Sequence, residues 1–90
     1  MDIEHWRKEI DEIDVELLRL LNVRARLALK VGALKKAASL PITDAERERV
    51  VLERLHEING GPLDDRAVDK LFRRIILESK RIEYAIEVQA

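Results

Sequence analysis

Arg24 and Lys35 lie on what is otherwise the apolar stripe of a predicted helix. Apolar residues recur at steps of three and four from Ile3 to Ala38, the spacing of a helix that buries one face. Arg24 occupies one position of that series, and Lys35 returns to within about 20° of the same face. Burying a cation is costly unless an anion meets it, so carboxylates of the protein or an anionic ligand must lie opposite.

Further polar side chains accompany these two cations on or near the inward faces of the predicted helices. They are Arg7, Asp44, Arg47, Glu48, Ser79 and Glu83. The set lacks a Cys or His nucleophile and a Gly-rich phosphate loop, so it suits the binding and polarisation of a small anion better than covalent chemistry. Arg7 lies about 100° around the helix from the Arg24 face, so we expect it to meet a different partner or a second site.

Most of these groups also have a purely structural interpretation. Arg24 could pair with a carboxylate of the protein, within a dimer of this chain, or extend its guanidinium group into solvent. Lys35, near a helix end, could be a surface cation favoured by the helix dipole. Asp44, Arg47 and Glu48 could form a capping turn with a solvated ion pair.

Ser79 and Glu83 leave the same choice open. A serine within a helix often donates back to the carbonyl four residues earlier, here that of Ile75. Glu83, between Ile82 and Tyr84, is most simply interpreted as exposed at a rim. These interpretations leave unexplained why the polar groups gather on the inward or near-inward faces of three predicted helices.

Size and composition limit the possible functions. Ninety residues make one domain, residues 1–90, and 39% charged with 47% hydrophobic residues is typical of amphipathic helices. The formal charge of -1 provides no global field for nucleic acid or an anionic membrane. With no cysteine and two histidines, we expect neither a metal nor another cofactor. No segment resembles a signal peptide or a membrane span, so a cytoplasmic protein is expected.

The apolar spacing predicts an all-α chain of three helices, one long, one short and one medium. The first, Ile3 to Ala38, follows an Asp2 cap and is about 50 Å long at 1.5 Å per residue. Pro41 prevents its continuation, because proline has no amide donor.

The other two helices also begin at acidic or hydroxyl residues. Thr43-Asp44-Ala45-Glu46 has the form of a capping box and opens a helix that runs to about Ile58. Asp64 or Asp65 caps the third helix. Its predicted inward stripe is Val68, Leu71, Phe72, Ile75, Ser79, Ile82 and Ile86.

Helix lengths predict a homodimer. The second helix, about 24 Å long, covers only half of the first, so a single chain would leave much of the apolar stripe in water. Two long first helices packed side by side would bury the remainder, and residues of one subunit could then enter a cavity of the other.

Five ordered segments carry a resemblance to a known family. They are RKEIDEID (7–14), LLRLLNVR (17–24), VGALK (31–35), PITDAERER (41–49) and the stretch 71–79. Together they resemble the all-helical chorismate mutases. The resemblance implies an intertwined homodimer of three-helix chains with two active sites. It also implies conversion of chorismate to prephenate, a [3,3] rearrangement on the route to phenylalanine and tyrosine that forms no covalent intermediate with the enzyme.

The resemblance also assigns roles around the reacting bond. It makes Arg24, and Arg7 donated by the other subunit, the clamps on two substrate carboxylates. Lys35 would bond a carboxylate and the ether oxygen of the breaking C–O bond. Arg24, Lys35 and Glu83 are therefore the expected catalytic residues.

The remaining assignments concern the ring of the substrate. Glu48, with the Asp44 region, would hold the ring hydroxyl, Arg47 would support this cluster, and Ser79 would touch the ring carboxylate. Glu83 stands where many bacterial relatives have glutamine as the second donor to the ether oxygen. A carboxyl group donates only when it is protonated, so we predict that turnover rises toward acidic pH.

Two alternatives stay open. An isochorismate pyruvate-lyase has a similar fold and cationic site but eliminates pyruvate from an isomeric substrate. A non-catalytic helical dimerisation module would use Arg24 and Lys35 to bind internal carboxylates, and replacing Arg24 with leucine would then stabilise it.

Overall fold

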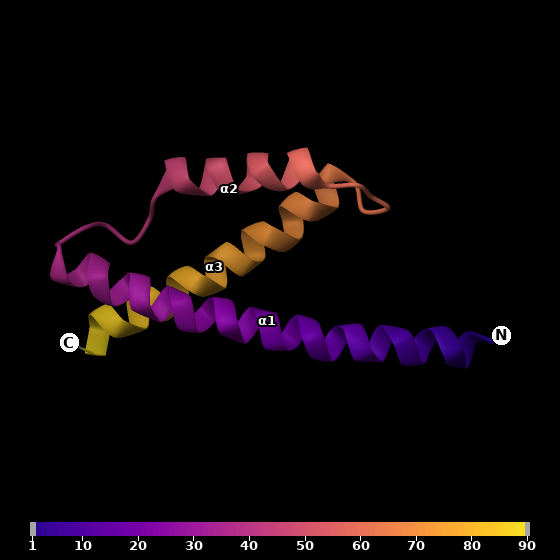
Figure 1. Cartoon of the computed structure of the whole chain (residues 1–90). Coiled ribbons are helices and arrows are strands. Elements are labelled where there is room, and N and C mark those ends of the chain that lie inside the picture. The colour runs from indigo at the N-terminus through magenta and orange to yellow at the C-terminus, as the bar shows by residue number, and fades with distance from the viewer. Residues whose placement is uncertain (1, 90) are drawn as a thin grey trace.

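Three helices make up the regular structure of the described residues (Figure 1). The computed structural model describes residues 2–89, and side chains for residues 2–85. The helices are α1 (Ile3–Ala37), α2 (Ala45–Ile58) and α3 (Asp65–Gln89), and the described residues contain no strand. The predicted all-α class and the order of long, short and medium helices are confirmed. The principal axes measure 55 × 27 × 15 Å, because α1 extends far beyond the other two helices.

Aspartate carboxylates cap the starts of the helices. The Asp2 carboxylate accepts a hydrogen bond from the His5 amide at 3.1 Å, as predicted. The Asp44 carboxylate accepts one from the Arg47 amide at 2.9 Å, so the predicted capping box at Thr43 is wrong by one residue. A charged carboxylate satisfies the free amides and also interacts with the positive end of the helix dipole, which a threonine hydroxyl does only weakly.

The loops between the helices define the start of α3 and the end of α1. At the start of α3, the Asp64 carboxylate accepts a hydrogen bond from the Ala67 amide at 2.8 Å, so Asp64 is the cap. At the end of α1, Ser39 takes a left-handed φ of 55° and the Leu40 amide donates to the Lys35 carbonyl at 2.8 Å. This tight reversal returns the chain alongside the last turn of α1.

α3 lies between the other two helices (Figure 1). α1 packs against α3 and α2 packs against α3, whereas α1 and α2 make no direct helix contact in the described chain. The expectation that the second helix covers part of the first is therefore wrong. α3 takes the place against α1 that the prediction gave to the second helix, and it packs against both of the other helices. The apolar side chains buried between them include Leu52, Val68 and Ile76.

The inward stripe of α3 differs in detail from its prediction. Val68 is buried as expected, but Leu71 is exposed and Ile76, which was not in the predicted stripe, is buried. Two neighbouring helices widen the covered surface of α3 beyond a single stripe. The last predicted member, Ile86, lies outside the residues whose side chains are described.

The N-terminal half of α1 is uncovered within one chain. Every described residue from 2 to 22 is exposed. Large apolar side chains among them are Ile3, Trp6, Ile10, Ile13, Val15, Leu17, Leu18, Leu20 and Leu21. A contiguous apolar surface of this kind marks an interaction site. No helix in the described part of the chain is long and apolar enough to cross a membrane.

Candidate active site

A cavity of about 290 Å³ opens where the C-terminal half of α1 faces α3 and the start of α2. Seven of the residues singled out in the sequence line it. They are Arg24, Lys35, Asp44, Arg47, Glu48, Ser79 and Glu83. Its other walls include apolar side chains such as Leu27, Val31, Val51 and Ile76. Such a cavity holds a small organic molecule and fixes its orientation with a few polar groups.

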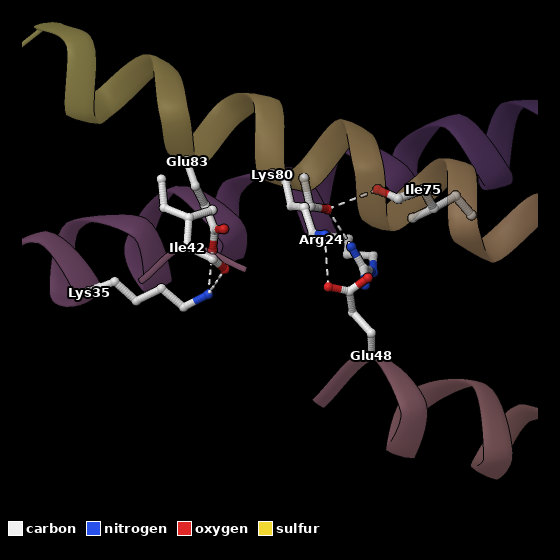
Figure 2. A network of polar contacts seen from close by, with 8 residues as sticks. Arg24, Lys35, Ile42, Glu48, Ile75, Lys80 and Glu83 are labelled. Carbon is white, nitrogen blue, oxygen red and sulfur yellow. Dashed lines mark hydrogen bonds and ion pairs between the residues drawn. The ribbon is translucent and has the colours of Figure 1, made fainter. Parts of the chain in front are cut away.

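Arg24 reaches from α1 to the hydroxyl of Ser79 on α3. Its Nη1 donates to Ser79 Oγ at 2.5 Å, and that hydroxyl in turn donates to the Ile75 carbonyl at 3.1 Å (Figure 2). The back-bonding expected of a helical serine is therefore confirmed, and it orients the oxygen that receives Arg24. Among the described residues no carboxylate forms an ion pair with Arg24. The guanidinium charge is thus available to an anion in the cavity.

Lys35 turns inward from the last turn of α1. Its Nζ donates to the Ile42 carbonyl at 2.8 Å and lies 3.5 Å from Glu83 Oε1 (Figure 2). Only 21% of the side chain is exposed, so the interpretation as a surface cation is wrong. The reversal after α1 makes this possible, because it carries the Ile42 carbonyl back over the ammonium group.

Glu83 is buried in the wall of the cavity rather than exposed at a rim. The residue is 7% exposed and its carboxylate is opposite the Lys35 ammonium. Gly32 of α1 lies directly against it: a Cβ at this position would come within 3.0 Å of Glu83 Cγ and 3.2 Å of Glu83 Cα. The glycine therefore permits the close approach of α1 and α3 that brings Glu83 to Lys35.

The start of α2 supplies the opposite wall. The Asp44 carboxylate caps the helix through the Arg47 amide, which confirms the capping interpretation of this turn. The carboxylate of Glu48 pairs with Lys80 of α3 rather than with Arg47 of the same turn. Arg49, next in the chain, bonds to Glu46 and Glu53 on the outer face, so it does not compete for the cavity.

Among the described residues, Lys80 is the one cavity cation that was not predicted from the sequence. Its Nζ lies 2.8 Å from Glu48 Oε2, and both side chains are less than one-third exposed, at 23% and 29% (Figure 2). A signal was present in the sequence, because Lys80 directly follows Ser79 and precedes Glu83 by a helical i, i+3 step.

Arg7 is not brought to the cavity within one chain. It lies near the N-terminus of α1, where its Nη1 bonds to Glu4 Oε1 at 2.8 Å and 65% of its side chain is exposed. The sequence expectation that Arg7 points elsewhere than Arg24 is consistent with this position.

The charges that line the cavity favour a small anion. The cations are Arg24, Lys35, Arg47 and Lys80, and the carboxylates are Asp44, Glu48 and Glu83. The described residues contain no cluster of His, Cys, Asp and Glu that could hold a metal ion. The arrangement can therefore clamp anionic groups at one end and accept a hydrogen bond from a neutral hydroxyl at the α2 wall.

Comparison with known proteins points to one family. The family model "Chorismate mutase type II" matches residues 6–84. A bifunctional chorismate mutase/prephenate dehydratase of Aquifex aeolicus is 42% identical over 97% of this chain, which corresponds to 25% of that relative. A chorismate mutase of Methanocaldococcus jannaschii is 33% identical over 86% of this chain and 79% of its own length. The chain thus spans about a quarter of the length of the first relative and most of the second.

Solved structures show the same arrangement of helices. A chorismate mutase of Thermus thermophilus (form II) superposes with a TM-score of 0.90 at 39% identity, covering 91% of this chain and 93% of that one. A chorismate mutase of Helicobacter pylori, solved in complex with prephenate, also has a TM-score of 0.90, at 27% identity over 98% of this chain and 96% of its own.

Proposed function

The chain belongs to the type II chorismate mutase family, and on that premise we propose that it converts chorismate to prephenate. The observation that carries the proposal is the gathering of seven predicted site groups around one cavity of small-molecule size. The product leads toward phenylalanine and tyrosine, so the chain would act in aromatic amino acid biosynthesis.

The chemistry needs positioning and charge rather than a nucleophile. In the [3,3] rearrangement the ether C–O bond of chorismate breaks while a C–C bond forms, and no proton or group leaves the molecule. Catalysis must therefore come from holding the enolpyruvyl arm over the ring and from stabilising negative charge on the ether oxygen. A millionfold acceleration corresponds to roughly 8 kcal/mol, which preorganised cationic donors can supply in a dry cavity.

We assign the carboxylate clamp to Arg24 and the ether oxygen to Lys35. Arg24 has a charge that no described carboxylate neutralises and a direction fixed by Ser79. Lys35 is held at the opposite end of the cavity by the Ile42 carbonyl, which leaves further donor hydrogens for a carboxylate and the ether oxygen of the substrate. Ser79 would contact the ring carboxylate by turning its hydroxyl hydrogen from the Ile75 carbonyl to the substrate, while its oxygen still accepts from Arg24.

Glu83 is the second group assigned to the ether oxygen. It lies next to Lys35 and is buried, but as an ionised carboxylate it would repel the negative charge that develops on this oxygen. Only the protonated form can donate a hydrogen bond there. The assignment therefore implies that turnover rises toward acidic pH.

The α2 wall is assigned to the ring hydroxyl. Glu48 would accept the hydroxyl hydrogen bond, with the Asp44 region beside it and Arg47 as a supporting cation. This division places hydrogen-bond acceptors where the substrate is neutral and cationic donors where it is charged.

We further propose that the working form is a homodimer that completes the site with the partner subunit's Arg7. The exposed large apolar residues of α1 run from Ile3 to Leu34, so the centre of the stripe is near Leu18. Two α1 helices paired antiparallel about that centre would place the partner subunit's Arg7 opposite about residue 30, between Arg24 and Lys35. This pairing of the two α1 helices would bury the exposed apolar surface and add a second cation that binds a substrate carboxylate.

A cytoplasmic location stays a prediction.

The direct experiment is to incubate the purified chain separately with chorismate and with isochorismate and to identify the products by chromatography. Prephenate from chorismate is the expected result. Pyruvate released from isochorismate would instead identify a lyase. If neither compound is converted, Arg24 and Lys35 have only a structural role, as in a helical dimerisation module.

A further inference from the structure

The Lys80–Glu48 ion pair is a polar link between α3 and α2 that faces the cavity. Lys80 Nζ lies 2.8 Å from Glu48 Oε2, and both residues line the cavity wall (Figure 2). The neighbouring helices offer one other such link between the described parts of α2 and α3, His56 to Asp69 at 2.6 Å, and neither of these residues lines this cavity. Both links therefore join α2 to α3, but only the Lys80–Glu48 pair faces this cavity.

We propose that Lys80 is a positioning residue for the reaction and acts through Glu48. It occupies one carboxylate oxygen, Oε2, and thereby keeps Glu48 turned so that Oε1 can accept the ring hydroxyl of chorismate. The inference rests on the proposed function and adds to it a residue for which the family resemblance assigned no role.

The Lys80–Glu48 ion pair fixes the position of α2 at the cavity. α2 packs on α3 and makes no direct helix contact with α1, so the distance from Glu48 to the Arg24 and Lys35 cations depends on how α2 sits on α3. A charge-assisted bond at the level of the cavity fixes that position locally. Because both side chains keep some exposure to solvent, the pair forms without the full desolvation cost of a buried ion pair.

Charge availability favours a positioning role over direct binding of a substrate carboxylate. Lys80 is already neutralised by Glu48, whereas Arg24 contacts a hydroxyl and has no ion-pair partner among the described residues. An incoming carboxylate therefore gains more from Arg24, because pairing with Lys80 would leave the Glu48 carboxylate unpaired.

The test is a double-mutant cycle measured with chorismate. We compare Lys80→Met, Lys80→Arg and Glu48→Gln with the double variant Lys80→Met/Glu48→Gln, and measure kcat, KM and Tm for each. Lys80→Met should lower kcat/KM about three- to tenfold in the unmodified background and by less than about twofold in the Glu48→Gln background. Lys80→Arg keeps the charge and should restore most of the loss.

Asp69→Leu provides the control. It removes the acceptor of the other link between α2 and α3, so it should lower Tm while leaving kcat/KM unchanged.

Three results would overturn the inference. Unchanged kinetics in Lys80→Met would remove any role for the residue, and a loss that persists undiminished beside Glu48→Gln would mean that Lys80 contacts the substrate itself. No turnover by the unmodified chain would overturn the proposed function, and the role of Lys80 with it.

Discussion

Gly32→Ala tests whether the close approach of α1 and α3 sets the catalytic geometry. The added Cβ would lie 3.0 Å from Glu83 Cγ, 3.2 Å from its Cα and 3.3 Å from its Cβ. The Cα belongs to the backbone of α3 and cannot rotate away, so α3 must move by a few tenths of an ångström. Glu83 moves with it, and the 3.5 Å contact with Lys35 changes.

Two opposing terms determine the stability of this variant. Alanine is favoured over glycine inside a helix by about 1 kcal/mol, whereas overpacking a tight contact costs about 1–3 kcal/mol. The net expectation is a destabilisation of up to about 2 kcal/mol, and a loss of about 2 kcal/mol lowers the Tm of a domain of this size by roughly 8–16 °C. The activity should fall about tenfold or more, mainly in kcat, because losing an electrostatic donor entirely costs about 100- to 1000-fold and here the group is only displaced.

The assay is thermal unfolding together with chorismate kinetics, with Gly60→Ala as the control. A Cβ at Gly60 meets nothing within 4 Å and its φ is not in the left-handed range, so this substitution should leave both Tm and kcat unchanged or raise Tm slightly. A Gly32→Ala protein with the kcat of the unmodified chain and an equal or higher Tm would refute the argument that Gly32 sets the position of Glu83.

Three further outcomes follow from the site. Turnover should rise toward acidic pH, and Glu83→Gln should flatten this dependence because an amide donates at every pH. A flat profile for the unmodified chain, in buffers from mildly acidic to mildly basic, would contradict the role of Glu83. Arg24→Ala and Lys35→Ala should each lower kcat/KM about 100-fold or more, and full activity in both would refute the site assignment. The inactive Arg7→Ala and Arg24→Ala chains, mixed, unfolded and refolded together, should recover about a quarter of the sites. Half of the dimers are then mixed, and each mixed dimer has one intact site. No recovery of activity would argue against a shared site.

Much of the fold followed from local patterns in the sequence. The spacing of apolar residues predicted three helices, and the end of α1 and the start of α2 each differ from the prediction by one residue. Helix periodicity is a local property, so it could also place Arg24 and Lys35 on one face before any tertiary contact was known. The resemblance to the family then selected seven groups that the fold brings to one cavity.

Tertiary structure decided what local patterns could not specify. That α3, rather than α2, packs on α1 depends on contacts between residues far apart in the chain. The burial of Glu83 against Gly32 and the pairing of Lys80 with Glu48 arise from the same helix arrangement. The sequence by itself determined which helices form and which faces carry cations, because both depend on neighbours within a few turns. Only the packed structure decided which carboxylate meets which cation, because that depends on distances between helices.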